Sequence, residues 1–188
     1  MIGDEVFLVG DSIKLYVSDV GSNTKGAQIS VSRANEGFLK CLFEEGYQDI
    51  VEGTIVIKKV ARRSGERCKI ALYSNDPNLD AAGSCIGPNG SKVQKIVSQL
   101  GNGVNKEKID VINWYENPAL FIIEAIKPAQ ALGLIMEDNN HAKIVVNDDQ
   151  YTVAIGRRGV NVFLAAKITG YKLEIKTLDE VLASGLTY

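Results

Sequence analysis

Cysteine, proline, histidine and tryptophan are scarce in this chain of 188 residues, which has three cysteines, four prolines, one histidine and one tryptophan. Cys41, Cys68 and Cys85 are odd in number, lie far apart and include no Cys-x-x-Cys pair. This spacing argues against a disulfide framework or a zinc site and favours free thiols in a reducing compartment. His141 lies in a polar stretch without an evident partner, so we expect a solvent-exposed ring with no catalytic or metal-binding role.

Long hydrophobic runs and an excess of basic residues are also absent. No segment approaches the ~20 apolar residues of a membrane span, and the N-terminus lacks the basic region and apolar core of a signal peptide. We therefore expect a cytoplasmic protein with no membrane contact. The net charge of −2 and the pI near 5.5 argue against a generally basic nucleic-acid-binding protein. The sequence contains no nucleophile–base pair and no Walker loop, so we expect neither an enzyme nor a cofactor.

The basic residues that are present are unevenly distributed. Arg62, Arg63, Arg67 and Lys69 fall within eight residues that contain a single acid, Glu66. Such a cluster is either an ordinary solvated turn or a contact for phosphates, and the sequence leaves both interpretations open. Local charge matters more than net charge for a groove that follows a nucleic-acid backbone.

Hydrophobic periodicity predicts the same order of elements, α-β-β-α-α-β, twice in succession. In the first copy the expected helices and strands cover residues 38–43, 54–61, 68–73, 80–86, 91–100 and 109–114, with a glycine stop at 101–103. In the second copy they cover residues 118–126, 131–136, 143–146, 148–155, 160–169 and 172–175. Two strands at 11–20 and 27–31, joined by a turn at 21–26, precede both copies and are too few to bury a core.

A short glycine loop lies at the same place in each copy, between the two consecutive helices. Both loops read Ile-Gly-x-x-Gly, and each has a valine six residues after the first glycine. Glycine lets the chain turn sharply and lets a phosphate approach without a Cβ in the way, and the helix start that follows attracts an anion. The candidate RNA-binding residues are Ile86, Gly87, Pro88, Asn89, Gly90, Ser91, Lys92, Val93, Ile155, Gly156, Arg157, Arg158, Gly159, Asn161 and Val162, with Arg62, Arg63 and Arg67 from the basic cluster.

The repetition of the loop is more informative than the loop itself. A single Gly-x-x-Gly often joins two packed helices for steric reasons alone. Two copies in matching settings, one of them carrying Arg157 and Arg158, predict a tandem clamp for single-stranded RNA of the kind that KH domains form. Trp114 is a candidate for base stacking, although a tryptophan on an apolar strand is more often part of a core.

Several longer motifs resemble the NusA family of transcription elongation and antitermination factors. They are Val31-Ser32-Arg33, Ile57-x-x-Val60-Ala61-Arg62, Arg67-x-Lys69-Ile70-Ala71, Ser74-Asn75-Asp76, Gly83-x-Cys85-Ile86-Gly87, Glu107-Lys108-Ile109-Asp110 and Ala154-Ile155-Gly156-x-x-Gly159-x-Asn161. The resemblance implies an α+β fold of two tandem type II KH domains, preceded by the last strands of an S1 (OB-like) β-barrel. The implied boundaries are 1–34 for the partial S1 segment, 35–115 and 116–180 for the two KH domains, and 181–188 for a C-terminal tail.

The resemblance also implies partners. The KH domains of this family bind single-stranded RNA in the nascent transcript, and the full-length proteins contact RNA polymerase and antitermination factors. The polymerase-binding domain of the family has no counterpart in this sequence, so we expect either a piece of a longer protein or a shortened homologue.

Two other classes of protein use KH domains and stay open as alternatives. One is the RNA-binding tail of a nuclease or GTPase, which a nucleotide-hydrolysis assay would reveal. The other is a ribosome-associated or scaffold protein that uses the repeats for protein contacts, which would show no RNA affinity at low salt.

Overall fold

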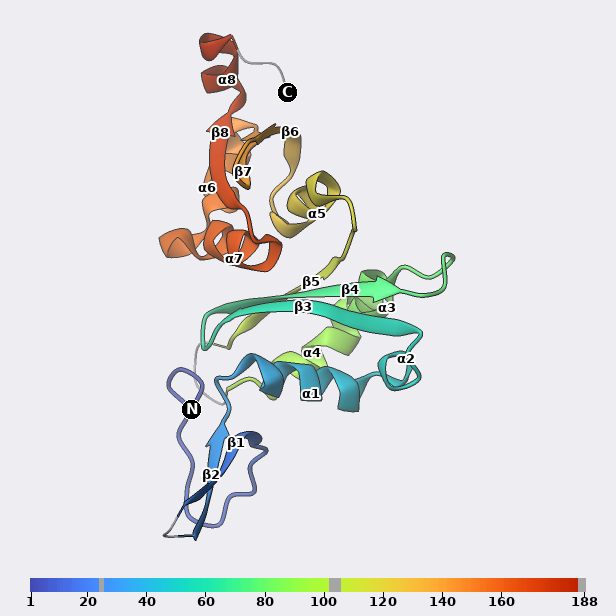
Figure 1. Cartoon of the computed structure of the whole chain (residues 1–188), viewed down its shortest axis with the longest axis vertical. Helices are drawn as coiled ribbons and strands as arrows, with labels where there is room; N and C mark the ends of the chain where they lie inside the picture. The colour runs from blue at the N-terminus through green and yellow to red at the C-terminus, as the bar shows by residue number, and fades with distance from the viewer. Residues whose placement is uncertain (24–25, 102–105, 186–188) are drawn as a thin grey trace.

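The computed structural model of the chain describes residues 1–23, 26–101 and 106–185. The predicted glycine stop at 101–103 and the turn at 21–26 lie partly outside these residues. Figure 1 shows three successive parts: an N-terminal β-hairpin, a first α/β unit and a second α/β unit. No helix in the described part of the chain is long and apolar enough to cross a bilayer.

The first unit has the predicted order of elements around a three-stranded sheet. It consists of α1 (Glu36–Gly46), α2 (Gln48–Val51), β3 (Ile55–Arg63), β4 (Arg67–Ser74), α3 (Ala81–Ile86), the 3-10 turn η1 (Pro88–Gly90), α4 (Ser91–Val97) and β5 (Lys108–Asn113). The strand order is β3-β4-β5, in which β4 pairs antiparallel with β3 and parallel with β5. The periodicity of α1 buries Phe38, Leu39, Leu42 and Phe43 against this sheet.

The second unit repeats this arrangement. Its elements are α5 (Pro118–Ala125), β6 (Ala131–Glu137), β7 (His141–Val146), α6 (Asp148–Ile155), the 3-10 turn η2 (Arg157–Gly159), α7 (Val160–Thr169), β8 (Lys172–Thr177) and α8 (Leu178–Ser184). Its sheet has the order β6-β7-β8, again with one antiparallel and one parallel pair. The predicted fold of two tandem type II KH domains is therefore confirmed.

Some predicted details differ from the structure. Helix α4 ends at Val97, three residues before the predicted end, although Leu100 is still fully buried. The buried face of α5 is centred on Phe121, Ile122 and Ala125, whereas Ile123, which the periodicity places in the apolar stripe, is exposed. The segment expected as a tail from residue 181 forms most of helix α8, which starts with a capping box between Thr177 and Glu180.

The N-terminal hairpin consists of β1 (Tyr16–Asn23) and β2 (Gly26–Ser32), which pair antiparallel. The first strand begins five residues later than the predicted start at residue 11. Val20 and Ile29 on this hairpin are 66% and 64% exposed, so its apolar side chains do not form a core.

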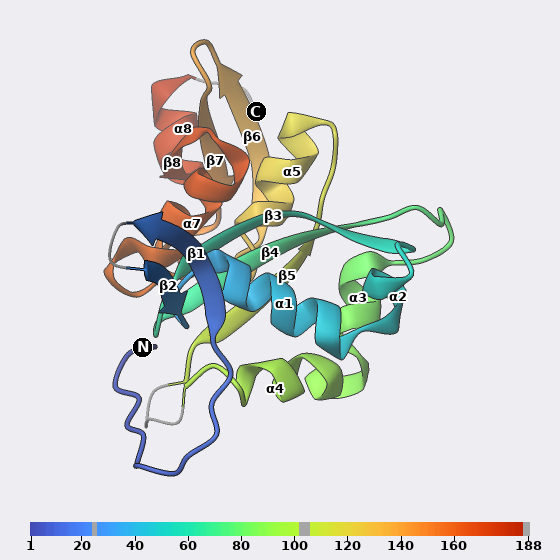
Figure 2. The same cartoon turned by 60° about the horizontal axis from the view of Figure 1, so that its bottom comes forward.

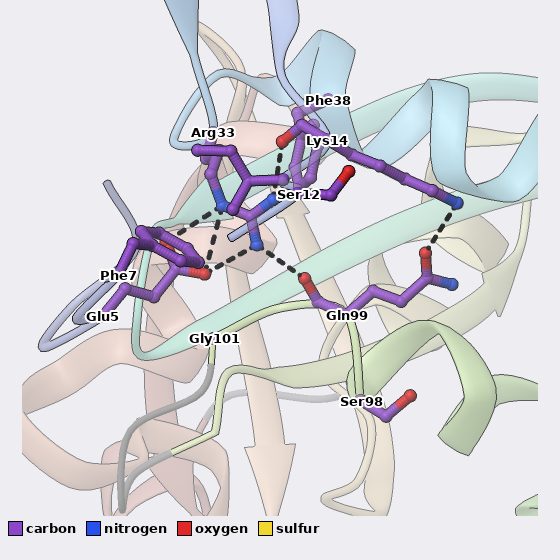
Figure 3. A pocket seen from close by; sticks show the side chains of 10 residues that line it. Glu5, Phe7, Ser12, Lys14, Arg33, Phe38, Ser98, Gln99 and Gly101 are labelled. Carbon is purple, nitrogen blue, oxygen red and sulfur yellow. Dashed lines mark hydrogen bonds and ion pairs between the residues drawn. The ribbon is translucent and has the colours of Figure 1, made fainter. Parts of the chain in front are cut away.

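A buried arginine fixes the N-terminal segment to the first unit. The Arg33 guanidinium contacts both carboxylate oxygens of Glu5, at 2.6 Å for the shortest distance, and donates to the backbone carbonyls of Lys14 and Gln99 (Figure 3). Arg33 lines a small pocket beside these contacts, but its guanidinium is engaged by Glu5 and the two carbonyls. Burial has the largest single effect and would raise the pKa of the Glu5 carboxyl, but the hydrogen bonds from Arg33 and Ile2 together with the nearby positive charges lower that pKa overall.

The two α/β units share a hydrophobic core. Ala61, Ala71 and Ile112, on the strands of the first unit, pack in the same cluster as the helices of the second. Helix α7 lies across β3 and β4, as Figures 1 and 2 show. The fully buried Lys69 adds a polar link, because its Nζ donates to the Asp110 carboxylate at 2.9 Å and to the Lys127 carbonyl at 2.6 Å. The shared core and this polar link hold one unit against the other.

Candidate nucleic-acid interface

The two glycine loops have the same backbone conformation. In the first, Gly87 has φ 72° and ψ 172°, Asn89 has φ 50° and ψ 29°, and Gly90 has φ 73° and ψ 13°. In the second, Gly156 has φ 76° and ψ 166°, Arg158 has φ 52° and ψ 29°, and Gly159 has φ 71° and ψ 13°. Four of these six residues are glycines in a region that L side chains rarely adopt. The identical sequence pattern thus produces one loop geometry twice.

The two glycines of each loop are needed for different reasons. A Cβ on Gly87 would lie 2.8 Å from Cγ of Lys92, and a Cβ on Gly156 would lie 2.9 Å from the backbone nitrogen of Asn161. The first glycine therefore allows the loop to pack closely on the next helix. By contrast, a Cβ on Gly159 would meet nothing within 4 Å, and one on Gly90 only Val93 at 3.9 Å. The space beside the second glycine is open to a ligand.

The second glycine of each loop also begins the helix that follows. Gly90 is the N-cap of α4 and Gly159 is the N-cap of α7, and neither helix start has a side chain that caps its first N–H groups. These N–H groups face the loop, where a phosphate would be stabilised. A loop that offers backbone donors beside open space is suited to gripping a sugar-phosphate backbone.

Charge distinguishes the two loops. Arg157 and Arg158 are exposed, and neither has an ion-pair partner among the described residues. In the first loop, Pro88 and Asn89 are exposed and neutral, and the nearest cation is Lys92, whose Nζ donates to the Ser84 carbonyl at 3.1 Å. The second loop is therefore the more strongly attractive one for an anion.

A groove of about 700 Å³ joins the second loop to the first unit. On one side are Gly156, Arg157 and Arg158, and on the other are residues from the β3–β4 turn and the start of β5. The groove residues from the first unit are Gly65, Glu66, Arg67, Lys106 and Lys108. Five cations and one carboxylate line it, so its potential is positive although the whole chain carries a net charge of −2. Lys106 and Lys108 were not among the predicted site residues. They flank Glu107, which is fully buried in the structure, and the sequence alone does not show this burial.

Two predicted site residues, Arg62 and Asn161, and the neighbouring Lys69 are buried inside the fold and do not line the groove. Arg62 is buried, its Nε and Nη2 contact Glu107 at 2.7 and 2.9 Å, and its Nη1 donates to the carbonyls of Arg33 and Asn35. Asn161 is fully buried and donates to the carbonyls of Ile126 and Ala154. Lys69 is buried as described above. The predictions of a phosphate contact for Arg62 and of an RNA contact for Asn161 are therefore wrong, because their polar atoms are used inside the fold.

The other residues of the basic cluster lie nearer the surface. Arg63 is exposed, lies 3.6 Å from Glu66 and has its guanidinium 5.8 Å from the centre of the Phe163 ring. Arg67 lines the groove while pairing with Asp110 at 3.5 Å and with Asn161 at 3.3 Å. The cluster is thus neither a solvated turn nor a phosphate patch as a whole, since it divides into core and surface residues.

The apolar residues beside the loops differ in burial. Ile86, Ile155 and Val162 are half-buried next to the loops, whereas Val93 is 7% exposed and belongs to the core. Cys85 beside the first loop is buried, and burial raises the pKa of its thiol to about 12, which keeps it a neutral thiol. No group of metal-ligating side chains occurs among residues 1–23, 26–101 and 106–185.

Comparison with known sequences assigns both units to the same family. The pattern of the NusA-like first KH domain matches residues 33–114, and that of the NusA-like second KH domain matches residues 118–183. The chain belongs to the NusA family. It is 42% identical to the transcription termination/antitermination protein NusA of Bacillus subtilis over 184 residues, which are 97% of this chain and 48% of that protein. The NusA of Thermus thermophilus is 39% identical over 187 residues, which are 96% of this chain and 47% of that protein.

The chain therefore spans about half the length of these NusA relatives. Their names describe transcription proteins and no catalytic activity. Among solved structures, APE1850 is similar with a TM-score of 0.51 and 20% identity, over 75% of this chain and 97% of that protein. At this identity the likeness supports the fold alone.

Proposed function

We propose that this chain is a non-catalytic module that binds single-stranded RNA through both glycine loops, as part of a transcription elongation, termination and antitermination factor. The observation that carries the proposal is the repeated loop geometry, with open space and uncapped helix N–H groups beside Gly90 and Gly159. The basic groove between the second loop and the first unit supports a single strand that contacts both units.

The wider context of the NusA relatives extends the proposal. Their name connects them with transcription termination and antitermination, so the RNA we propose is a nascent transcript in the cytoplasm, with RNA polymerase and antitermination factors as partners of a full-length protein. We also propose that residues 1–34 form the end of an S1 barrel. The exposed apolar side chains Val17, Val20, Ile29 and Val31 on its two strands support this, because an isolated hairpin leaves such residues without a core.

The proposal is tested with fluorescently labelled random-sequence RNAs of about 4, 8 and 12 nucleotides, since one KH unit grips about four nucleotides. Anisotropy titrations should show at least about tenfold tighter binding once an RNA reaches both loops, through effective concentration. Gly90→Asp and Gly159→Asp place a carboxylate in the open space beside each loop. Each variant should abolish the gain from length and leave the binding of the shortest RNA to the other unit.

Gly53→Asp is the matched control for Gly90→Asp. Gly53 lies in the same unit, has φ +78°, and would likewise place its Cβ in open space. Both substitutions cost about 1 kcal/mol of backbone strain, so melting curves should shift alike while only Gly90→Asp weakens RNA binding. Equal RNA affinity in the two variants would refute the role of the loop, and an affinity that does not grow with RNA length would refute the tandem clamp. Nucleotide hydrolysis by the chain would instead favour the enzyme alternative.

A further inference from the structure

A second candidate surface lies on the first sheet, on the face that the second unit covers only in part. The strands β3 and β4 extend beyond α5 in Figure 1. At that end the rings of Tyr73 and Trp114 meet edge to face, with their centres 5.7 Å apart. The ammonium of Lys58 lies 5.0 Å from the centre of the Tyr73 ring and 4.8 Å from that of Trp114. Tyr73 is 39% exposed and Trp114 is half-buried. We call Lys58, Lys59, Tyr73 and Trp114 the aromatic platform.

The platform is positively charged, because its two lysines have no ion-pair partner among the described residues. Lys59 lies over a third ring, that of Phe121, at 5.6 Å. Phe121 is only 4% exposed, so the rings that a solute can reach are those of Tyr73 and Trp114. Both lysines are exposed and without a carboxylate partner, so their ammonium groups are available to an anion. A solute that has both flat rings and negative charge satisfies the two features together.

We propose that the aromatic platform binds single-stranded RNA that continues from the basic groove along β5. One or two bases stack on Tyr73 and Trp114, while Lys58 and Lys59 contact the phosphates on either side. Aromatic side chains next to lysines are the usual means of holding an unpaired strand, because each base presents a ring face and each nucleotide a charge. The flexible stem of Lys58 lets its ammonium move from the rings to a phosphate as a base arrives.

The topology of the first unit gives the strand a path to the platform. Strand β5 is at the edge of the sheet, begins at Lys108 in the basic groove and ends at Asn113, directly before Trp114. Its six residues span about 20 Å, which is comparable with the reach of the few nucleotides that one KH unit grips. The groove at one end of β5 leads to the second loop, and the platform lies at the other end. The inference rests on the proposed RNA binding and adds a contact at the end of β5 that lies away from the basic groove.

The only tryptophan of the chain reports directly on this contact. Random-sequence RNAs of about 8 nucleotides, which are long enough for both loops, are compared with RNAs extended by about four nucleotides at the 5′ end or at the 3′ end. One of the two extensions should quench the fluorescence of Trp114 and bind about 5- to 30-fold more tightly than the unextended RNA. The unextended RNA should bind with little change in fluorescence.

Three variants and one control test the residues. Lys58→Gln and Tyr73→Ser change side chains at the surface, so both should fold, and both should remove most of the gain from the extension. Lys40→Gln also removes an exposed cation, on α1 at the other side of the sheet, and should keep the gain. Melting curves are recorded for all three. Trp114→Leu keeps an apolar side chain toward the second core and should also lose the gain.

The outcomes separate this inference from the proposed function. If the unextended RNA binds and the Gly90→Asp variant weakens it, but neither extension changes fluorescence or affinity, the loops bind RNA and the platform does not. If the extended RNA quenches Trp114 equally in the wild type and in Lys58→Gln and Tyr73→Ser, the quenching comes from elsewhere and the inference fails. If no RNA binds the wild type, the proposed function fails first. Quenching by an acidic peptide but by none of the RNAs would assign the platform to a protein partner and overturn the proposal.

Discussion

The middle positions of the glycine loops show how different residues are accommodated on one backbone. Asn89 and Arg158 occupy equivalent places with φ near 50°. Asparagine is among the residues that tolerate this region, whereas arginine there is uncommon. An uncommon conformation at an exposed, unpaired arginine is consistent with a functional constraint on its charge.

Exchange of the middle residues between the loops should change affinity with little change in fold. Arg157→Pro combined with Arg158→Asn gives the second loop the sequence of the first on the same backbone. We expect weaker RNA binding and a salt dependence whose log–log slope falls by about 0.7 for each phosphate that the loop no longer neutralises. Anisotropy titrations at several salt concentrations measure both quantities.

The reverse exchange is the matched control for this loss. Pro88→Arg combined with Asn89→Arg should strengthen binding and steepen the salt dependence of the first loop. An unchanged slope in both exchanges would show that the loop arginines do not reach phosphates, whatever the effect on affinity.

The buried polar residues show why the site could be predicted only in part from the sequence. The loop glycines were identified because the pattern occurs twice. Arg62 was misassigned because its partner Glu107 lies 45 residues away, and nothing local distinguishes a buried arginine from an exposed one. Asn161 was misassigned because it follows the second loop closely, yet its amide closes the inside of the α6–α7 corner by bonding the Ala154 carbonyl at 3.0 Å.

The ion pair of Glu5 and Arg33 should make part of the stability depend on pH. Burial would raise the pKa of Glu5, but the hydrogen bonds from Arg33 and Ile2 and the positive charges of Arg33 and the N-terminus together lower it from its ordinary value of 4.5 in the folded chain. A carboxyl with a lowered folded pKa stabilises the fold above its unfolded pKa, and this contribution is lost as the pH falls through the folded value. Glu5→Gln should therefore be less stable than the wild type at pH 7, and the difference should shrink below about pH 4.5. Urea unfolding at pH 7, 5 and 3.5 checks this. A difference that stays constant over this range would contradict the assigned pKa.

At the scale of elements, the sequence predicted best those helices and strands that have a clear apolar period. Both helix–loop–helix segments and all six strands of the two units were found, because each contains a run or a period of apolar residues bounded by turn residues. Helix α2 was missed because four residues give no periodic signal. Helix α8 was missed although Thr177 and Glu180 have the spacing of a capping box, since only one of its residues, Val181, is buried.

The capping box of α8 should contribute most of that helix's local stability. Thr177→Val removes the side-chain oxygen that accepts the Glu180 N–H and should destabilise α8 by about 1 kcal/mol. Hydrogen exchange of the α8 amides should accelerate while the amides of α7 keep their protection. Thr152→Val, at an exposed position inside α6, is the control with the same change of side chain and should leave α8 protected. Equal exchange of α8 in both variants would mean that packing of Val181 alone holds the helix.

For the whole molecule, the packing of the second unit on the sheet of the first was the feature hardest to predict from the sequence. In the structure Cys68, Lys69, Ile70, Ala71 and Leu72 of β4 are all buried, as in a strand covered on both faces. In the sequence, Lys69 interrupts the apolar run and hides this signal. The sequence does not say what covers the second face. The structure shows that α7 does, which brings the β3–β4 turn and the start of β5 against the second loop.

This arrangement predicts that residues of the first unit contribute to RNA binding by the second. Lys106→Gln combined with Lys108→Gln removes two exposed cations from the groove beside Arg157 and Arg158. Because the side chains of both lysines are exposed, stability should change by less than about 0.5 kcal/mol. RNA that reaches both loops should bind more weakly, with a slope of salt dependence reduced by about 0.7 for each phosphate that the groove no longer neutralises. Adding Gly90→Asp silences the first loop, and the lysine substitutions should still weaken the binding that remains. If they have no effect in that background, the groove cations serve the first loop only and the two units bind RNA as separate sites on a shared core.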